Sequence, residues 1–293
     1  MHQAPTNGQL LRFSYVFAMK FTKVFVVCHT LMLLLFNNYD GSNLSNIQYI
    51  ILHGLPLLQF VLQIALILRE CEIIKYCTKR LLLIEPNPRS LRNVYILLSD
   101  TLTSFNKPLI DFTLYTSLLF GKPLTHFDLL LSSLPSGVRI FQCLREYYLL
   151  QETELMMNAL KYCSNLPIII CTWYTRIHDA NSIPKSFYSI RVFFLILNST
   201  YTFYWDVRRD WTLTSFTSLR KNKLIFKPTV YRSAIIVDFI IRFWWVWIFV
   251  YAQNDTRNFI FFNSELYYFE IIRRANWIIF KLESEYSNRP IKS

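Results

Sequence analysis

Glycine is scarce in this chain and accounts for only five of its 293 residues, so a Gly-rich nucleotide-binding loop is not expected. The six cysteines form no C-x-x-C pair and have no histidines at metal-ligand spacing, and we interpret them as small apolar residues within helices. The five histidines are scattered, and no G-x-S-x-G, H-E-x-x-H or P-loop motif occurs. The sequence therefore predicts no enzyme, no metal site and no bound cofactor.

Acidic residues are also few, with 19 Asp and Glu against 31 Lys and Arg, which gives a net charge of +12. Such an excess can indicate a nucleic-acid partner, but here the basic residues lie at the ends of hydrophobic blocks or inside them, not on one polar face. A membrane protein with basic cytosolic loops accounts for most of them. We therefore expect membrane lipid, and no nucleic acid, as a partner.

What the chain has in excess is apolar surface: 53% of its residues are hydrophobic and 17% are aromatic. The apolar residues come in blocks long enough to cross a bilayer. They predict an all-α, polytopic transmembrane helical bundle with about eight spans. A kink is expected at Pro108, and whether the fourth span crosses fully stays open. The predicted spans are Phe13–Phe36, Ile47–Leu68, Val94–Phe120, Phe127–Leu150, Leu155–Tyr174, Phe187–Trp205, Arg232–Tyr251 and Phe259–Leu282.

The distribution of Lys and Arg predicts the orientation of these spans. With the N-terminus in the cytosol, the cytosolic segments carry 17 Lys and Arg and the opposite loops carry three. Both termini are therefore expected to be cytosolic. The N-x-S/T sequons at Asn43 and Asn254 then lie on the non-cytosolic side, although glycosylation of either stays open. The sequon at Asn198 lies within a span and is interpreted as a chance match.

The last span combines apolar length with buried charge. In the stretch Phe262–Tyr286, helical periodicity places a charged stripe opposite an apolar face formed by Ile272, Ala275 and Ile279. Charges at membrane depth are unfavourable, so the stripe should face protein or a water-filled cavity. The stripe consists of Glu270, Arg273, Arg274, Trp277 and Lys281.

Arg242 lies midway along the seventh span, four residues after Asp238 and on the same helix face. One interpretation is a self-neutralising pair that fixes helix packing. The other is part of an anion site, because the guanidinium fork matches phosphate or carboxylate oxygens. For Arg273 and Arg274, snorkelling to the interface is the alternative to a role in an anion site.

Further charged residues lie inside or beside the spans. Asp206 and Asp210 could balance arginine charges, pass protons or end a helix, and the residues leave these options open. Asp100 and Lys161 are within spans, and Tyr162 follows Lys161. At membrane depth the chain holds three anions and four cations, which favours a divalent anionic substrate. The anions are Asp100, Asp238 and Glu270, and the cations are Lys161, Arg242, Arg273 and Arg274.

Six segments carry a resemblance to the EXS domain of eukaryotic phosphate exporters: LLSDTLTS, LPSGVRIFQCLREY, NALKYCS, LNSTYTFYWDVRRDW, IIVDFIIRFWW and FEIIRRANWIIFKLESEY. The resemblance covers about residues 91–286. It implies a division into residues 1–90, with two transmembrane helices, and an EXS domain at 91–293 with about six. An SPX sensor domain, found in the larger members, is expected to be absent. The chain is similar to short fungal members of the family.

The resemblance implies roles for individual residues. Phosphate-binding residues would be Lys161, Tyr162, Arg242, Arg273 and Arg274. Residues that line the pore or balance its charge would be Asp100, Thr103, Asp206, Asp210, Asp238, Trp245 and Glu270. Thr103 stands where larger members have Asn, and Lys281 replaces the usual Arg, so these two positions depart from the family pattern.

These implications predict a Golgi multi-pass membrane protein, with the endoplasmic reticulum or plasma membrane as alternative locations. It would move inorganic phosphate from the Golgi lumen to the cytosol and support retention of luminal endoplasmic-reticulum proteins. The alternative is a non-transporting sorting adaptor that binds cytosolic tails of Golgi glycosyltransferases through the basic connector 207–227. Transport direction, proton coupling, regulation and oligomeric state stay open, with a homodimer as one option.

Overall fold

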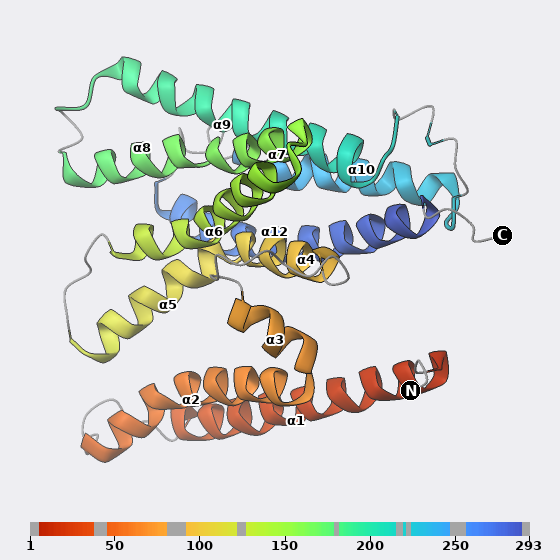
Figure 1. Cartoon of the computed structure of the whole chain (residues 1–293). Helices are drawn as coiled ribbons and strands as arrows, with labels where there is room; N and C mark the ends of the chain where they lie inside the picture. Colours follow the sequence, from red (N-terminus) through yellow and green to blue (C-terminus); the bar gives the residue numbers. More distant parts are fainter. Residues whose placement is uncertain are drawn as a thin grey trace. The chain divides into compact units, whose positions relative to one another are not determined.

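The computed structural model describes residues 6–37, 46–80, 92–121, 127–178, 182–214, 219–220, 224–246 and 256–288. Every regular element within these ranges is a helix, as the all-α prediction requires (Figure 1). The chain divides into two compact units, one of residues 1–83 and 118–122 and one of residues 84–117 and 123–293. The predicted boundary at residues 90 and 91 and the sequons at Asn43 and Asn254 lie outside the described residues.

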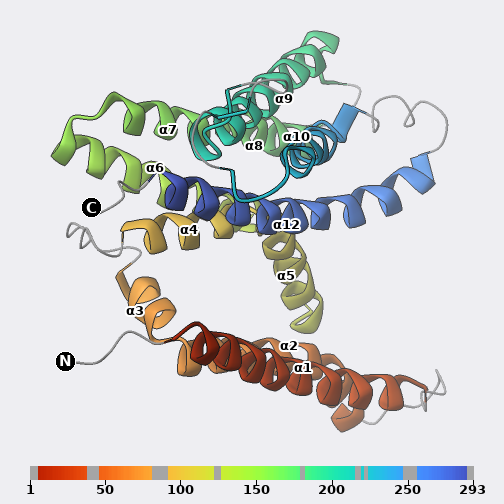
Figure 2. The same ribbon diagram turned by 90° about the vertical axis from the view of Figure 1, so that its right-hand side faces the viewer.

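The first unit contains α1 (Asn7–Asn37), α2 (Asn46–Glu70) and the short α3 (Glu72–Arg80). Helices α1 and α2 form an antiparallel hairpin (Figures 1 and 2). Lys20, which interrupts the first apolar block, pairs with Glu70 at 2.8 Å. Among the described residues, α1 alone has the length and hydropathy of a membrane span, and its most apolar part is almost entirely unburied within the protein.

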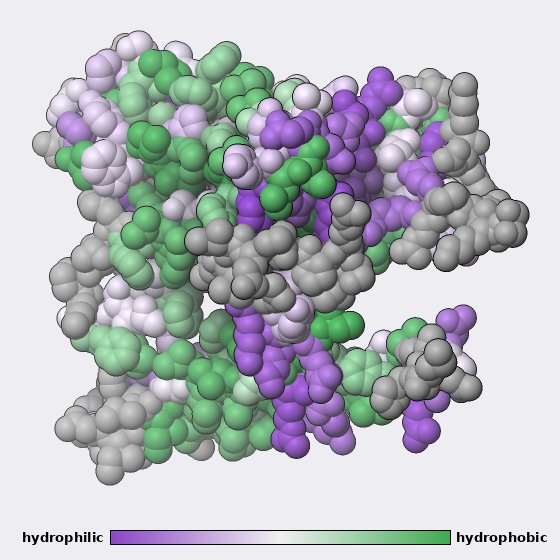
Figure 3. Space-filling view, viewed as in Figure 1, coloured by the Kyte–Doolittle hydropathy of each residue, from purple (hydrophilic) through white to green (hydrophobic). Residues whose placement is uncertain are grey.

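The surface of this unit is apolar along its long helices. Leu11, Val27 and Phe36 on α1, and Leu58 and Val61 on α2, are at least half exposed. Hydrophilic residues gather instead over α3, shown in purple in Figure 3. Apolar side chains exposed along two 25- to 31-residue helices are what a lipid environment would cover.

The second unit contains the helices α4 (Arg92–Thr103), α5 (Asn106–Leu119), α6 (Phe127–Leu150), α7 (Thr153–Cys163), α8 (Leu166–Ile177), α9 (Lys185–Trp205), α10 (Pro228–Arg242) and α12 (Thr256–Ser287). The five residues Asp206–Asp210 continue α9 as a π-helical turn. Helix α12 packs against both α4 and α10, and α6 packs against α7 (Figures 1 and 2).

Three of the predicted spans are interrupted helices. The third span breaks at Ser104 and Phe105, and the fifth breaks at Ser164 and Asn165. The seventh span is helical as far as Arg242 and then turns at Phe243 and Trp244. We had predicted only a kink at Pro108 in the third span, so the number of interruptions was underestimated.

Proline explains two of these breaks. A proline ring clashes with the carbonyl group four residues earlier in a helix, and proline lacks the N–H that would bond to it. For Pro108 that carbonyl belongs to Ser104, and α4 ends just before it, at Thr103. For Pro167 it belongs to Cys163, where α7 ends. Each proline therefore stops the helix one turn upstream of itself and then starts the next one.

The C-terminal half of α12 packs into a hydrophobic core with the segment that follows the π-helical turn. This core includes Trp211, Leu213, Tyr231, Trp277 and Phe280, each at most 6% exposed. A buried polar network lies beside the core and links it to α12.

Glu283 is the centre of that network. It pairs with the guanidinium of Arg220, and its Oε1 accepts hydrogen bonds from the Tyr231 hydroxyl at 2.8 Å and the Ile225 amide at 3.3 Å. Burial, together with the hydrogen bond to Glu283, raises the pKa of the Tyr231 phenol above its ordinary value, so it stays a donor. Two residues of the connector, Arg220 and Ile225, and Tyr231 of α10 are thus tied to one carboxylate of α12.

We predict that Glu283→Ala destabilises the protein strongly, because it leaves the buried Arg220 without its counter-charge. The expected loss is about 3–5 kcal/mol, measured as a fall in the thermal unfolding temperature of the purified protein in detergent. Glu285→Ala is the matched control, since Glu285 is more exposed and its pair with Lys281 is 3.9 Å long. Equal shifts for the two variants would contradict the role of Glu283.

Candidate functional site

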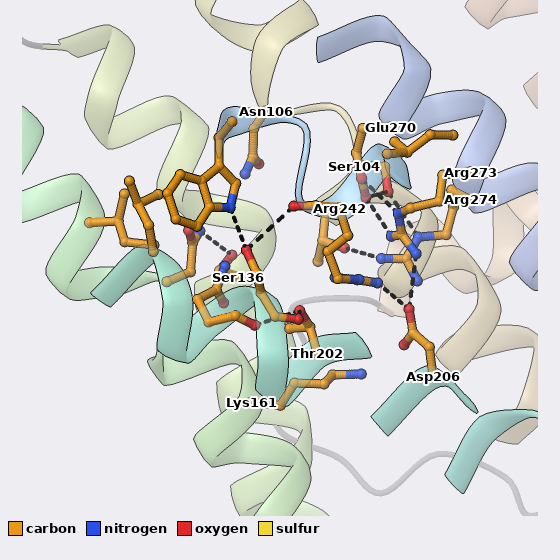
Figure 4. A pocket seen from close by; sticks show the side chains of 18 of the residues that line it. Ser104, Asn106, Ser136, Lys161, Thr202, Asp206, Arg242, Glu270, Arg273 and Arg274 are labelled. Carbon is orange, nitrogen blue, oxygen red and sulfur yellow. Dashed lines mark hydrogen bonds and ion pairs between the residues drawn. The ribbon is translucent and has the colours of Figure 1, made fainter. Parts of the chain in front are cut away.

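A cavity of about 330 Å³ lies where the three interrupted spans meet (Figure 4). Each interruption contributes lining residues: Ser104 and Asn106 at the first, Asn165 at the second and Trp244 at the third. Helices α6, α9 and α12 and the π-helical turn complete the walls. The cavity is therefore built mainly from helix ends and from the charged face of α12.

Helix α12 directs its predicted charged stripe inward. Arg273 is 2% exposed and Trp277 is fully buried, whereas Ile272 and Ile279 on the opposite face are 54% and 50% exposed. The pattern matches the helical periodicity predicted for this stretch. It also excludes snorkelling for Arg273 and Arg274, because both side chains are buried among other elements of the unit.

Arg273 is the centre of a buried charge cluster. Its Nη1 donates to Asp206 at 2.9 Å and to Asp238 at 2.8 Å. Its Nε and Nη2 donate to Glu270 at 2.7 and 2.5 Å. One guanidinium thus joins three carboxylates from the π-helical turn, α10 and α12. Such a fully paired cation is held firmly in place.

Arg242 shares two of the same carboxylates. It pairs with Asp206, and its Nε contacts Asp238 at 3.5 Å, so the i,i+4 pair predicted from the sequence is the longer of its two contacts. Asp206 is the first residue beyond the predicted sixth span. Burial alone would raise its pKa, but the charges of Arg242 and Arg273 outweigh that effect and lower it to about 2. Asp206 is therefore ionised at any physiological pH.

Arg274 has no carboxylate partner in the part of the chain that the structure describes. Its Nε donates to the Ser104 hydroxyl at 2.8 Å and its Nη2 to the Thr103 hydroxyl at 3.1 Å. The guanidinium lies over the ring of Trp277, 4.7 Å from the centroid. Its Nη1 is buried and has no hydrogen-bond partner among the described residues. Arg274 consequently presents to the cavity a charge that no described carboxylate pairs with directly.

Lys161 is the second cation of this kind. It is 4% exposed and lies over the rings of Tyr162 and Trp205, 4.6 and 5.4 Å from their centroids. Within the described ranges no carboxylate oxygen comes within 4.0 Å of its ammonium group. In Figure 4 the side chain extends into the cavity beside Asp206. Lys161 and Arg274 are thus the cations available to an anionic ligand.

Asp100 belongs to a separate polar group behind this wall. It pairs with Arg139 of α6 and accepts a hydrogen bond from the hydroxyl of Tyr162. Arg139 also donates to Gln142 at 2.9 Å and to Ser99 at 3.3 Å. Tyr162 lines the cavity, whereas Asp100 and Arg139 do not. Asp100 therefore positions Tyr162 and does not line the cavity itself.

Arg139 was not among our predicted site residues, although a signal for it is present in the sequence. Helix α6 buries polar residues at helical spacing along one face. These residues are Asp128, Ser132, Ser136, Arg139 and Gln142. A polar face within an otherwise apolar helix marks that helix as facing a polar interior.

The other predicted residues divide between the cavity and its surroundings. Thr103, Trp245 and Glu270 line it, and Asp238 lies outside it. Asp210 also lies outside, where it accepts hydrogen bonds from Trp277 at 3.1 Å and from Lys281 at 3.0 Å. Of the alternatives considered for Asp210, charge balance is the one that this geometry supports.

The wall opposite the charge cluster combines uncharged polar groups with apolar residues such as Ile168 and Leu195, and its polar residues apart from Trp245 were not predicted. The Ser164 hydroxyl donates to Asn198 at 2.8 Å, and the Trp245 indole donates to Ser199 at 2.9 Å. Asn198, whose sequon is a chance match within a span, lines the cavity. Asn165 lies in the break of the fifth span and begins the sequence Asn-x-Pro. Asn106 begins the same sequence directly after the break in the third span. That repeated pattern could have predicted the second break.

Comparison with known proteins identifies the family. The family model described as "EXS family" matches residues 3–287. The chain belongs to the EXS family. The match confirms the resemblance drawn from the motifs, and it includes residues before position 91, which the motifs did not cover.

Two yeast relatives of this EXS-family chain align over most of its length. Protein ERD1 of Saccharomyces cerevisiae is 50% identical over 291 residues, 96% of this chain and 80% of that protein. Protein ERD1 of Kluyveromyces lactis is 33% identical over 309 residues, 90% and 78% of the two chains. Solute carrier family 53 member 1 of the mouse is 30% identical over 167 residues, 53% of this chain and 24% of that protein.

The two neighbouring arginines of this EXS-family protein should differ in their effect on stability. Arg273→Gln removes the cation shared by three carboxylates, so we expect a large fall in the thermal unfolding temperature. Arg274→Gln breaks hydrogen bonds to two hydroxyl groups and leaves no carboxylate unpaired, so the expected fall is small. Unfolding of both purified variants in detergent measures the difference. An equal fall, or a larger one for Arg274→Gln, would contradict the assignment of Arg273 as a structural cation and of Arg274 as a cation available to a ligand.

Proposed function

We propose that the protein carries inorganic phosphate across the Golgi membrane, from the lumen to the cytosol, and so returns phosphate released during glycosylation. This transport would support retention of luminal endoplasmic-reticulum proteins and of Golgi glycosyltransferases. The observation that carries the proposal is a cavity into which two buried cations, Lys161 and Arg274, point, neither of them with a carboxylate partner among the described residues.

The depth of the cavity supports this function. Ser104, Ser164 and Phe243 at the three interruptions lie 9 to 11 residues from the start of their predicted spans. At 1.5 Å per residue this is about 15 Å, half of a hydrocarbon core about 30 Å thick. Interrupted helices at that depth are tolerated only where they are buried in protein or line a wet cavity. Discontinuous helices at mid-depth are also a common way to build substrate sites in transporters.

The chemistry of the lining suits a phosphate ion. A guanidinium with unused donors and an ammonium group can together replace much of the hydration shell of a tetrahedral anion. Hydroxyl and amide groups such as those of Thr202 and Asn165 on the uncharged wall supply neutral contacts. The carboxylates Asp206 and Glu270 limit the net positive charge, which keeps binding weak enough for release.

The membrane setting is part of the proposal. We propose eight spans with both termini in the cytosol, on the basis of apolar blocks and of the asymmetry in Lys and Arg. The apolar length of α1 and its exposed surface support a membrane location. The name of the mouse relative, a solute carrier, supports a transport role, and the similarity to the ERD1 proteins supports a role in the secretory pathway.

The sorting-adaptor alternative would use the basic connector 207–227. Within its described part, Arg220 is buried against Glu283 and Arg209 pairs with Glu154 at 2.6 Å. Two of the cations available to bind a cytosolic tail are therefore already paired. This observation favours transport over the adaptor role.

The proposal predicts that Lys161→Gln and Arg274→Gln each reduce phosphate flux at least about tenfold, because a lost charged hydrogen bond is worth about 1.5–3 kcal/mol. Arg274→Ala should abolish flux and leave membrane insertion intact. Flux is measured as uptake of labelled phosphate into liposomes that contain purified protein, with and without a pH gradient.

Arg92→Gln is the matched control, since Arg92 is a partly exposed arginine that pairs with Glu146 at 3.1 Å, away from the cavity. It should retain flux. Unchanged flux in both Lys161→Gln and Arg274→Gln would rule out the proposed site.

A further inference from the structure

Asp206 uses only one of its two carboxylate oxygens to hold the arginines. Both Arg242 and Arg273 contact Oδ2. Oδ1 accepts no hydrogen bond from any residue that the structure describes, although Asp206 lines the cavity. In Figure 4 the dashed lines meet one oxygen of Asp206, and the other oxygen faces the side of the cavity where Lys161 ends. A free carboxylate oxygen and an ammonium group without a carboxylate partner among the described residues thus face the same side of the cavity, more than 4.0 Å apart.

The other carboxylates of the cluster offer no such oxygen to a ligand. Glu270 lines the cavity, but Oε1 accepts from Arg273 and Ser104, and Oε2 accepts from Arg273. Asp238 contacts Arg273 through Oδ1 and Arg242 through Oδ2, and it does not line the cavity. Asp206 is thus the one carboxylate, among those described in this cluster, with an acceptor directed into the cavity.

A carboxylate oxygen and an ammonium group that face the same space suit an anion that both accepts and donates hydrogen bonds. Phosphate and arsenate keep at least one proton at neutral pH, so an O–H group of the anion can donate to a carboxylate while its ionised oxygens accept from a cation. Sulfate has no proton at that pH and would place an anionic oxygen against the carboxylate. A buried acceptor without a donor, or two like charges in contact, is strongly unfavourable.

We propose that Oδ1 of Asp206 selects for oxyanions that carry a proton, by accepting a hydrogen bond from the O–H group of the anion while Lys161 donates to one of its ionised oxygens. The site thereby rejects fully ionised oxyanions of the same shape. This inference rests on the proposed transport function and names the residue that defines the substrate class. The low pKa of Asp206 supports it, since the acceptor stays ionised over the physiological range.

The experiment compares four anions as substrates of the purified wild-type protein in liposomes at neutral pH: phosphate, arsenate, sulfate and monofluorophosphate. Monofluorophosphate is the sharpest probe, because it has the shape and double negative charge of hydrogen phosphate but a fluorine in place of the hydroxyl group. We expect transport of phosphate and arsenate, and at least about tenfold slower transport of the other two.

Each outcome bears on the inference. Transport of sulfate and monofluorophosphate at the rate of phosphate would overturn the role of Asp206 and leave phosphate transport intact. Transport of none of the four would overturn the inference together with the proposed function. Rejection of sulfate but not of monofluorophosphate would also overturn it, because selection would then not depend on the proton.

Two asparagine variants identify the residue responsible. Asp206→Asn should raise the rate of sulfate relative to phosphate at least about tenfold, because the amide can donate to an ionised oxygen. Asp238→Asn removes a carboxylate from the same two arginines without changing the cavity wall, so the sulfate-to-phosphate ratio should stay at the wild-type value. A ratio unchanged in Asp206→Asn would overturn the assignment. If either variant fails to fold, the comparison of the four anions on the wild-type protein still decides the inference.

Discussion

The second unit depends on one guanidinium. Arg273 holds carboxylates from the π-helical turn, α10 and α12, and Arg242 shares two of them. A buried cation is tolerated because each of its partners is charged and well placed, and the partners in turn would repel one another without it. The cluster fixes three elements at one point, next to the cavity. The ionic links among these three elements run through Arg273 and Arg242, so Arg274 and Lys161 can face the cavity with no carboxylate partner among the described residues.

The interrupted helices contribute residues to the same cavity. At each break a backbone amide bonds to a carbonyl three residues earlier instead of four, as Ser104 does to Thr101 at 3.1 Å and Asn165 does to Tyr162 at 3.3 Å. Two of the breaks follow directly from Pro108 and Pro167, because each proline ring clashes with the carbonyl group one turn earlier and has no N–H to bond to it. Ser104 and Asn165 at the first two breaks bring short polar side chains to the cavity, and Trp244 at the third brings an aromatic one. Charge from α12 and polar groups from helix ends thus meet in one space.

The sequence predicted the helical class, the inward face of α12 and most of the charged residues at the cavity, because hydrophobic periodicity reports which face of a helix is buried. It could not divide the arginines between structural and available roles. Arg273 and Arg274 are adjacent and chemically identical, and only their neighbours in space distinguish them. The uncharged wall was missed for a related reason. Asn198 and Ser199 are ordinary residues in an apolar helix, and their position beside the broken fifth span follows from tertiary packing.

The uncharged wall and the helix ends have one more consequence. Narrow apolar constrictions in channels can close by expelling their water, since a dry state is stable when nothing on the wall binds it. The cavity has hydroxyl and amide groups on one wall and cations on the other, and these groups bind water although Ile168 and Leu195 also line it. Under the transport function proposed above, closure by drying is therefore not expected. Occlusion would instead bring carboxylate partners to Lys161 and Arg274, as an exchange of ion pairs.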